Sequence, residues 1–120
     1  MMFIQKVEKF LSFRDKAKTK LLELIATRRL LAFLVTHEEK WENNHDLKLS
    51  IVTQCVNWQQ DMLSYLNKQT TDDRHERIVL THASVLASNI IKKHLFTIDT
   101  CKDIPSFKVI VKSMCEDTKF

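Results

Sequence analysis

The chain contains no glycine among its 120 residues and only one proline. A chain of this length would carry roughly 8 glycines at average usage. Glycine supplies the positive φ of tight hairpin turns and allows the backbone to approach a phosphate closely. Its absence excludes a P-loop, a dinucleotide-binding glycine motif and a G-x-S-x-G nucleophile elbow, and it disfavours hairpin-rich β folds. An all-helical protein is the fold class that remains.

The spacing of apolar residues predicts a compact all-α bundle of four to five helices, built as a single domain over residues 1–120. Hydrophobic residues make up 44% of the chain, which is enough for one core. The predicted helices are an N-terminal helix over about 3–35, two long central helices over about 47–66 and 74–96, and a short C-terminal helix over about 105–116. The last segment also alternates in a way that fits a strand.

The N-terminal helix is predicted either as one continuous helix or as a short helix followed by a long one. Apolar residues recur every seven positions along it, as at Phe3, Phe10 and Leu24. The segment Ser12–Asp15 reads S-F-R-D and has the form of a helix-start box, which places any break there. The predicted caps and first-turn residues of the other helices are Asp46, Thr71 or Asp72, and Pro105.

The charge balance suits contact with an acidic partner. Nineteen Lys and Arg residues stand against fifteen Asp and Glu residues, which gives a net charge of +4. No apolar window is long enough to span a membrane, and the N-terminus lacks the apolar region of a secretory signal. The three cysteines are odd in number and widely spaced. These features predict an intracellular protein, cytoplasmic or nuclear, with reduced thiols.

Metal and catalytic signatures are incomplete in this sequence. His37-Glu38 begins like H-E-x-x-H, but Trp41 occupies the position of the second histidine, and Glu42 and His45 form only half of a di-iron signature. Cys55 lies on the apolar face of a predicted helix, where a thiol behaves as a small hydrophobe. We therefore expect no metal, no cofactor and no enzyme, and an enzyme using Cys101 or the histidines is disfavoured.

His82 and Asn89 interrupt the apolar stripe predicted for the third helix, which consists of Ile78, Val79, Val85, Leu86 and Ile90 and also contains Lys93. One interpretation buries both polar side chains in the core, where each would be hydrogen-bonded and would fix the register. The other places them at an interface with a partner, where the histidine could respond to pH. The sequence leaves both alternatives open.

The function that the sequence favours is a non-enzymatic interaction module, an adaptor or complex subunit, that docks a partner protein through an apolar and basic face of the N-terminal helix. The residues assigned to this face are Arg14, Lys18, Leu21, Arg28 and Trp41. Tryptophan and arginine are enriched at binding hot spots. The alternatives are internal pairing of the basic residues, and packing of Trp41 over one end of the bundle. Self-association through the same face is a variant of this hypothesis.

A small basic nucleic-acid-binding protein is the alternative function. Residues 1–36 carry eight Lys and Arg against three acids, and Lys9, Lys16 and Lys20 share one side of the predicted helix. Other basic residues lie on nearly the opposite side, whereas a groove-binding helix gathers them on one face. This hypothesis therefore depends on charge alone.

Overall fold

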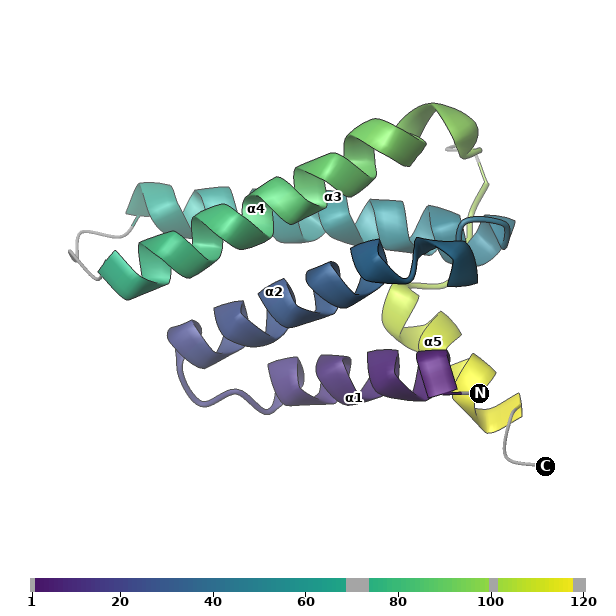
Figure 1. Ribbon diagram of the computed structural model, residues 1–120, viewed down its shortest axis with the longest axis horizontal. Helices are drawn as coiled ribbons and strands as arrows, with labels where there is room; N and C mark the ends of the chain where they lie inside the picture. The colour runs from purple at the N-terminus through teal and green to yellow at the C-terminus, as the bar shows by residue number, and fades with distance from the viewer. Residues whose placement is uncertain (1, 69–73, 100–101, 118–120) are drawn as a thin grey trace.

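The computed structural model describes residues 2–68, 74–99 and 102–117 of the chain. Its helices are α1 (Met2–Asp15), α2 (Lys20–Thr36), α3 (His45–Lys68), α4 (Arg74–His94) and α5 (Phe107–Asp117), with the short 3-10 turns η1 (Glu38–Lys40) and η2 (Leu95–Thr97) (Figure 1). The described residues form no strand. The predicted all-α bundle is confirmed, and the C-terminal segment is a helix.

The helices enclose one core. In Figure 1, α2 lies between α4 above it and α1 below it, and it packs against both. Helix α3 packs against α4 and α5, and α5 also packs against α1, so the first and the last described helices are in contact. The largest fully buried side chains of this core include Ile4, Leu30, Ile51 and Phe107 from four different helices, and Trp41 from the turn that follows η1.

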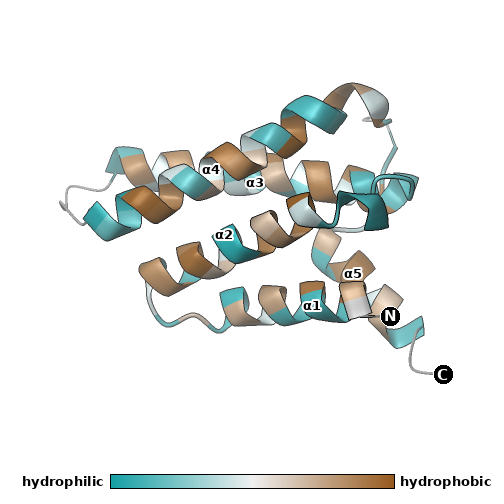
Figure 2. Cartoon of the chain, viewed as in Figure 1, coloured by the Kyte–Doolittle hydropathy of each residue, from teal (hydrophilic) through white to brown (hydrophobic). Residues whose placement is uncertain are grey.

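Each helix in Figure 2 carries both hydrophilic and hydrophobic residues, as amphipathic helices of a bundle do. No helix within the described ranges has the length and the apolar composition that crossing a membrane requires.

The N-terminal helix is broken, and the break comes later than the sequence motif suggested. Helix α1 ends at Asp15, and Thr19 caps α2 by accepting a hydrogen bond from the Leu22 amide at 3.1 Å. The expected helix start at Ser12 is wrong. The Ser12 carbonyl instead accepts the Lys16 amide in the last turn of α1. The short-plus-long alternative is correct, and its start signal is the threonine.

Helix α2 ends without a left-handed residue, since no described residue has a positive φ. No glycine caps the end of α2. The η1 turn follows the helix instead, and the side chain of Trp41, after this turn, contacts the last turn of α2. The indole Nε1 donates a hydrogen bond to the Leu34 carbonyl at 2.8 Å. Carbonyls in the last turn of a helix lack a partner inside it, so the indole satisfies a group that the backbone leaves open.

The remaining caps differ from the predicted ones by one or two residues. Asn44, not Asp46, caps α3, because its side chain accepts the Leu47 amide at 3.1 Å. Pro105 lies just outside α5, and Ser106 takes the cap position, with its hydroxyl 3.4 Å from the Val109 amide. The expected caps Thr71 and Asp72 lie outside the described residues.

The core face of α4 overlaps only part of the stripe that the sequence suggested, because Val79 and Ile90 are buried as expected but Ile78 and Val85 are exposed. Its core face includes Val79, Ala83, Ala87 and Ile90, all of which are buried. Small alanine side chains allow close approach of α4 to its neighbours, a signal that a search for large apolar residues misses. The interpretation of His82 and Asn89 as buried polar residues is therefore wrong, since both side chains are exposed.

Candidate functional site

Arg14 joins α1 to α2 and is not available on an open face. Its Nε donates a hydrogen bond to Thr27 Oγ1 at 2.8 Å, and its Nη2 lies 3.4 Å from Glu23 Oε1. The guanidinium also lies over the Trp58 ring, 5.1 Å from the ring centroid, an arrangement in which the cation and the π face attract one another. Of the two expectations for Arg14, the structure shows internal pairing.

The other residues assigned to the partner-binding face do not assemble into one surface. Trp41 is fully buried, which contradicts its assignment as an exposed contact, and its ring packs edge-on to His94 at a centroid distance of 4.8 Å. Leu21 is half-buried and packs against the core. Arg28 is also half-buried, and only Lys18 is exposed. The predicted face is therefore largely directed inward.

The exposed apolar residues of this region form a different surface, centred on Phe13. Phe13 is 53% exposed on α1 and separates two shallow grooves. One groove, of about 500 Å³, runs between α1 and α5 over Leu11 and Val111. The other, of about 380 Å³, runs between α1 and α2 and includes Leu22, which is 51% exposed. We call the two grooves together the Phe13 surface.

Basic side chains dominate the Phe13 surface. Six of them line the two grooves, against two acidic ones, Glu8 and Asp15. The six are Lys9, Lys16, Lys18, Arg29, Lys108 and Lys112. Asp15 forms an ion pair with Lys108, which leaves the electrostatic potential of the surface positive.

The lysines assigned to nucleic-acid binding are divided by the structure. Lys9 and Lys16 line the α1–α5 groove and belong to the Phe13 surface. Lys20 begins α2, where its Nζ lies 3.2 Å from Glu23 Oε1 and 4.7 Å from the centroid of the Tyr65 ring. The three side chains therefore do not form one row, because the break at the end of α1 changes the helix axis between them.

Phe13 and Leu22 are the surface residues that sequence reasoning missed. A signal for Phe13 was present, since Lys9 and Lys16 flank it at four and three residues, on the side of α1 opposite the core. Leu22 gave no such signal, because the adjacent leucines Leu21 and Leu22 do not show which of them faces outward.

A cluster of titratable groups joins η1 to the end of α4. Glu38 contacts His94, with 3.0 Å between Oε2 and Nε2, and its other oxygen forms an ion pair with Lys93. Burial acts to raise the pKa of Glu38, but the hydrogen bonds with Lys93 and His94 outweigh it and hold the pKa below its ordinary value. The same contact with Glu38 raises the pKa of Lys93. The cluster therefore links η1 to the end of α4, where His94 also contacts the Trp41 ring.

The described thiols are not placed for nucleophilic chemistry. Cys55 is fully buried in the core, as expected, and burial raises its pKa to about 12. Cys115 is also buried, and Cys101 lies outside the described residues. Over residues 2–68, 74–99 and 102–117, no three His, Cys, Asp or Glu side chains gather in a way that could hold a metal ion.

Comparisons of the chain with protein-family models, with curated proteins and with solved structures find no match. The residues described above therefore carry the functional argument.

Proposed function

We propose that this protein is a non-enzymatic interaction module that docks an acidic segment of a partner protein on the Phe13 surface. One observation carries the proposal: Phe13 and Leu22, both about half exposed, lie on grooves whose charged lining is mainly basic. An intracellular location belongs to the proposal and is supported by the free, buried thiol of Cys55.

The apolar component favours a protein partner. Aromatic side chains that leave water on binding are typical hot spots, and Phe13 stands between two grooves that could receive apolar side chains of a partner. Apart from Lys16, Ala17 and Lys18 in the link between α1 and α2, the residues that line both grooves belong to helices, so little backbone ordering opposes binding. The helix proposed here is the one that the sequence indicated, but the face is that of Phe13 and not that of Arg14 and Trp41.

The basic component favours an acidic partner. The six basic side chains around the grooves attract an acidic segment at long range, and their aliphatic stems extend the apolar floor. Binding through such a surface weakens as salt is added, because the charges are exposed and screened.

The test compares exposed substitutions on and off the Phe13 surface. Tagged wild-type protein, Phe13→Asp, Leu22→Asp and the control Leu63→Asp are cross-linked in cells that express the protein, and the cross-linked proteins are identified by mass spectrometry. Leu63 is 47% exposed on α3, away from both grooves. We expect one protein with an acidic segment to be recovered with the wild type and Leu63→Asp, and reduced at least tenfold with the other two. Recovery that is equal for all four proteins contradicts the proposal.

The same variants separate a protein partner from a nucleic acid or a second copy. Nucleic-acid binding predicts a mobility shift at low salt that Lys16→Glu abolishes and Phe13→Asp leaves in place. Self-association predicts a dimer in sedimentation experiments that Phe13→Asp converts to a monomer. Either result would contradict docking of an acidic partner protein and would favour the nucleic acid or the second copy instead.

A further inference from the structure

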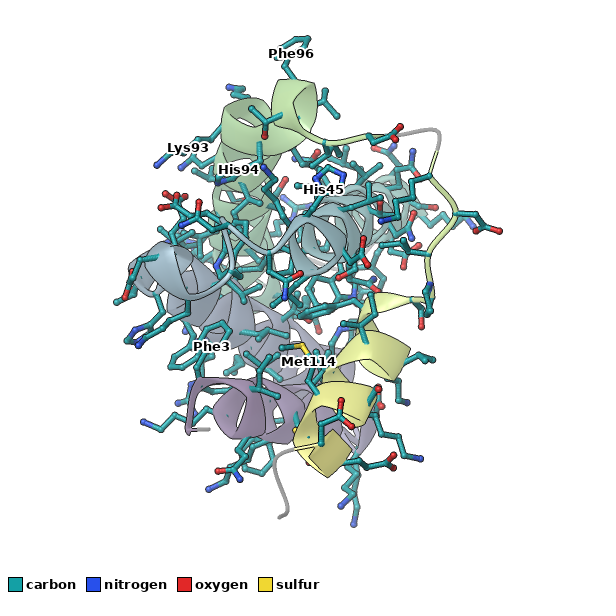
Figure 3. All side chains as sticks on the ribbon, turned by 90° about the vertical axis from the view of Figure 1, so that its right-hand side faces the viewer. Phe3, His45, Lys93, His94, Phe96 and Met114 are labelled. Carbon is teal, nitrogen blue, oxygen red and sulfur yellow. The ribbon has the colours of Figure 1, made fainter. Side chains whose placement is uncertain are left out.

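The outward face of α4 carries a row of exposed residues at the spacing of a coiled-coil seam. Steps of four, three, four, three and four residues separate its members, which are Ile78, His82, Val85, Asn89, Lys92 and Phe96. Ile78 is 59% exposed and Val85 is 51% exposed. Phe96, in the η2 turn that follows α4, is 92% exposed and projects away from the bundle (Figure 3). We call this row the α4 seam.

The bundle does not use the α4 seam. The buried residues of α4, such as Val79, Ala83 and Ala87, lie on the opposite side of the helix and pack toward α2 and α3. Helix α2 separates α4 from α1 (Figure 1), so the seam is also distinct from the Phe13 surface. Isolated apolar residues on a surface are ordinary, but Ile78 and Val85 lie two turns apart on the same side of one helix, and Phe96 continues the row in η2.

The pattern of the α4 seam fits a helix better than it fits a lipid surface. Alternating steps of three and four residues keep a row of side chains facing a second helix along its length. His82 and Asn89 lie within the row, and burying these polar groups in lipid would be costly. Between helices, an asparagine in the seam can hydrogen-bond across the interface and fix the register.

The charges beside the α4 seam favour an acidic helix. Arg74, Arg77 and Lys92 are exposed on α4. Glu76, the one acid of this helix, accepts a hydrogen bond from the Tyr65 hydroxyl of α3. The first turn of α4 contains Glu76 as well as Arg74 and Arg77, but the exposed charges that the structure describes there are the two arginines. A second copy of the chain would set these arginines against each other in a parallel pair, or against Lys92 in an antiparallel pair.

We infer that the α4 seam docks an acidic amphipathic helix of a partner protein. Ile78 and Val85 pack between its apolar side chains, and Asn89 faces a polar one. The basic residues at the two ends of α4 pair with acids that flank the partner's apolar row. The segment from Ile78 to Lys92 is about 21 Å long at 1.5 Å per residue, which requires two heptads of the partner helix.

The test uses a designed peptide of three heptads as the probe, with leucine at a and d, one asparagine at the central a position and glutamate at e and g. Its like charges at e and g oppose pairing of the peptide with itself. A matched peptide carries lysine at e and g. Binding of the fluorescently labelled peptides to the full chain is measured by anisotropy at low salt.

We expect a Kd in the micromolar range for the glutamate peptide and at least tenfold weaker binding of the lysine peptide. Val85→Asp should weaken binding of the glutamate peptide at least tenfold. The control Val109→Asp should not change it, because Val109 is similarly exposed, at 54%, but lies on α5. Circular dichroism checks that both variants fold.

Several outcomes would overturn the inference. These are no binding of the glutamate peptide at about 100 µM, equal binding of the two peptides, or equal loss in both variants. A dimer of the chain that Val85→Asp dissociates would make a second copy the occupant instead. Binding to phosphatidylserine vesicles that depends on Val85 would make it a lipid surface. Because the Phe13 surface is also proposed to take an acidic segment, binding of the glutamate peptide that Phe13→Asp abolishes and Val85→Asp leaves unchanged would place the peptide on that surface and overturn the inference.

Discussion

The indole Nε1 of Trp41 lies 2.8 Å from the carbonyl oxygen of Leu34 and donates a hydrogen bond to it inside the core. A side chain thus completes the end of α2 where a glycine-containing chain would use a left-handed residue. The contact also explains why Trp41 is buried although most of its neighbours in the sequence are polar.

Trp41→Phe removes this hydrogen bond and keeps an aromatic ring at the site. We expect the free energy of unfolding to fall by about 1–2 kcal/mol, because a buried carbonyl loses its partner. Urea denaturation followed by circular dichroism measures the change. Val35→Ala, on the exposed side of the same helix end, serves as the control and should change stability by less than about 0.5 kcal/mol. An unchanged midpoint for Trp41→Phe would show that the Leu34 carbonyl has another partner.

Arg14→Met tests whether Arg14 holds α1 and α2 together. Methionine retains an apolar side chain against Trp58 but loses the hydrogen bonds to Thr27 and Glu23. We expect a loss of about 1–2 kcal/mol in the free energy of unfolding. Lys18→Met is the matched change at an exposed position and should alter stability by less than about 0.5 kcal/mol. Equal midpoints for the two variants would contradict the structural role of Arg14.

Glu38→Gln should lower stability in a pH-dependent way. The pKa of Glu38 is lowered by folding, so its ionised form stabilises the fold above the ordinary value of 4.5, and this contribution is lost as the pH falls through the folded value. The pKa of Lys93 is raised, so its contribution is present below 10.5 and is lost as the pH rises through the folded value. At neutral pH we therefore expect Glu38→Gln to reduce the free energy of unfolding by about 1 kcal/mol.

This difference should shrink as the pH is lowered below 4.5, where the wild-type carboxylate also becomes protonated. Denaturation curves at a series of pH values measure it. Glu39→Gln, at the adjacent exposed position, controls for the loss of one negative charge and should show a much smaller effect. A difference that stays constant from neutral to acidic pH would rule out ionisation of Glu38 as its cause.

Ala83→Leu tests the orientation of α4. Ala83 is fully buried, so three additional heavy atoms have no space, and we expect a loss of about 1–3 kcal/mol. Val85→Leu, two residues away on the exposed side, adds a methylene and should change stability by less than about 0.5 kcal/mol. Thermal and denaturant unfolding measure both. The reverse order of stability would mean that α4 presents its other face to the core.

The fold class could be predicted from the sequence because it depends on composition and periodicity. The lack of glycine and the spacing of the apolar residues suffice for an all-α bundle with central helices close to those observed. The break after Asp15 was one of two alternatives, and its location depended on Thr19, whose hydroxyl caps α2 without the acidic partner of a capping box. In the sequence, Thr19 lies between two lysines, and nothing else near it marks it as a cap.

The orientation of each face was harder to predict. Large apolar residues at Ile78 and Val85 suggested that this side of α4 belongs to the core, but both are exposed and Ala83 and Ala87 are fully buried. Arg14 lies on the core side of α1 because its partners, Thr27 and Glu23, come from the next helix. Contacts between helices that are distant in the sequence are not contained in the periodicity of either one.

The packing of α5 on α1 has a dynamic consequence. Cys115 Sγ lies 3.7 Å from the Ile4 carbonyl oxygen across almost the whole chain, yet α5 has only 11 residues and would be marginal as an isolated helix. A short helix that depends on packing against its neighbours can open locally at a lower free energy than the rest of the fold, and its amide protons then exchange faster. Since Lys108, Val111 and Lys112 form one wall of the α1–α5 groove, any molecule held there also keeps α5 closed. A molecule bound in the α1–α5 groove should therefore slow the hydrogen exchange of the α5 amide protons.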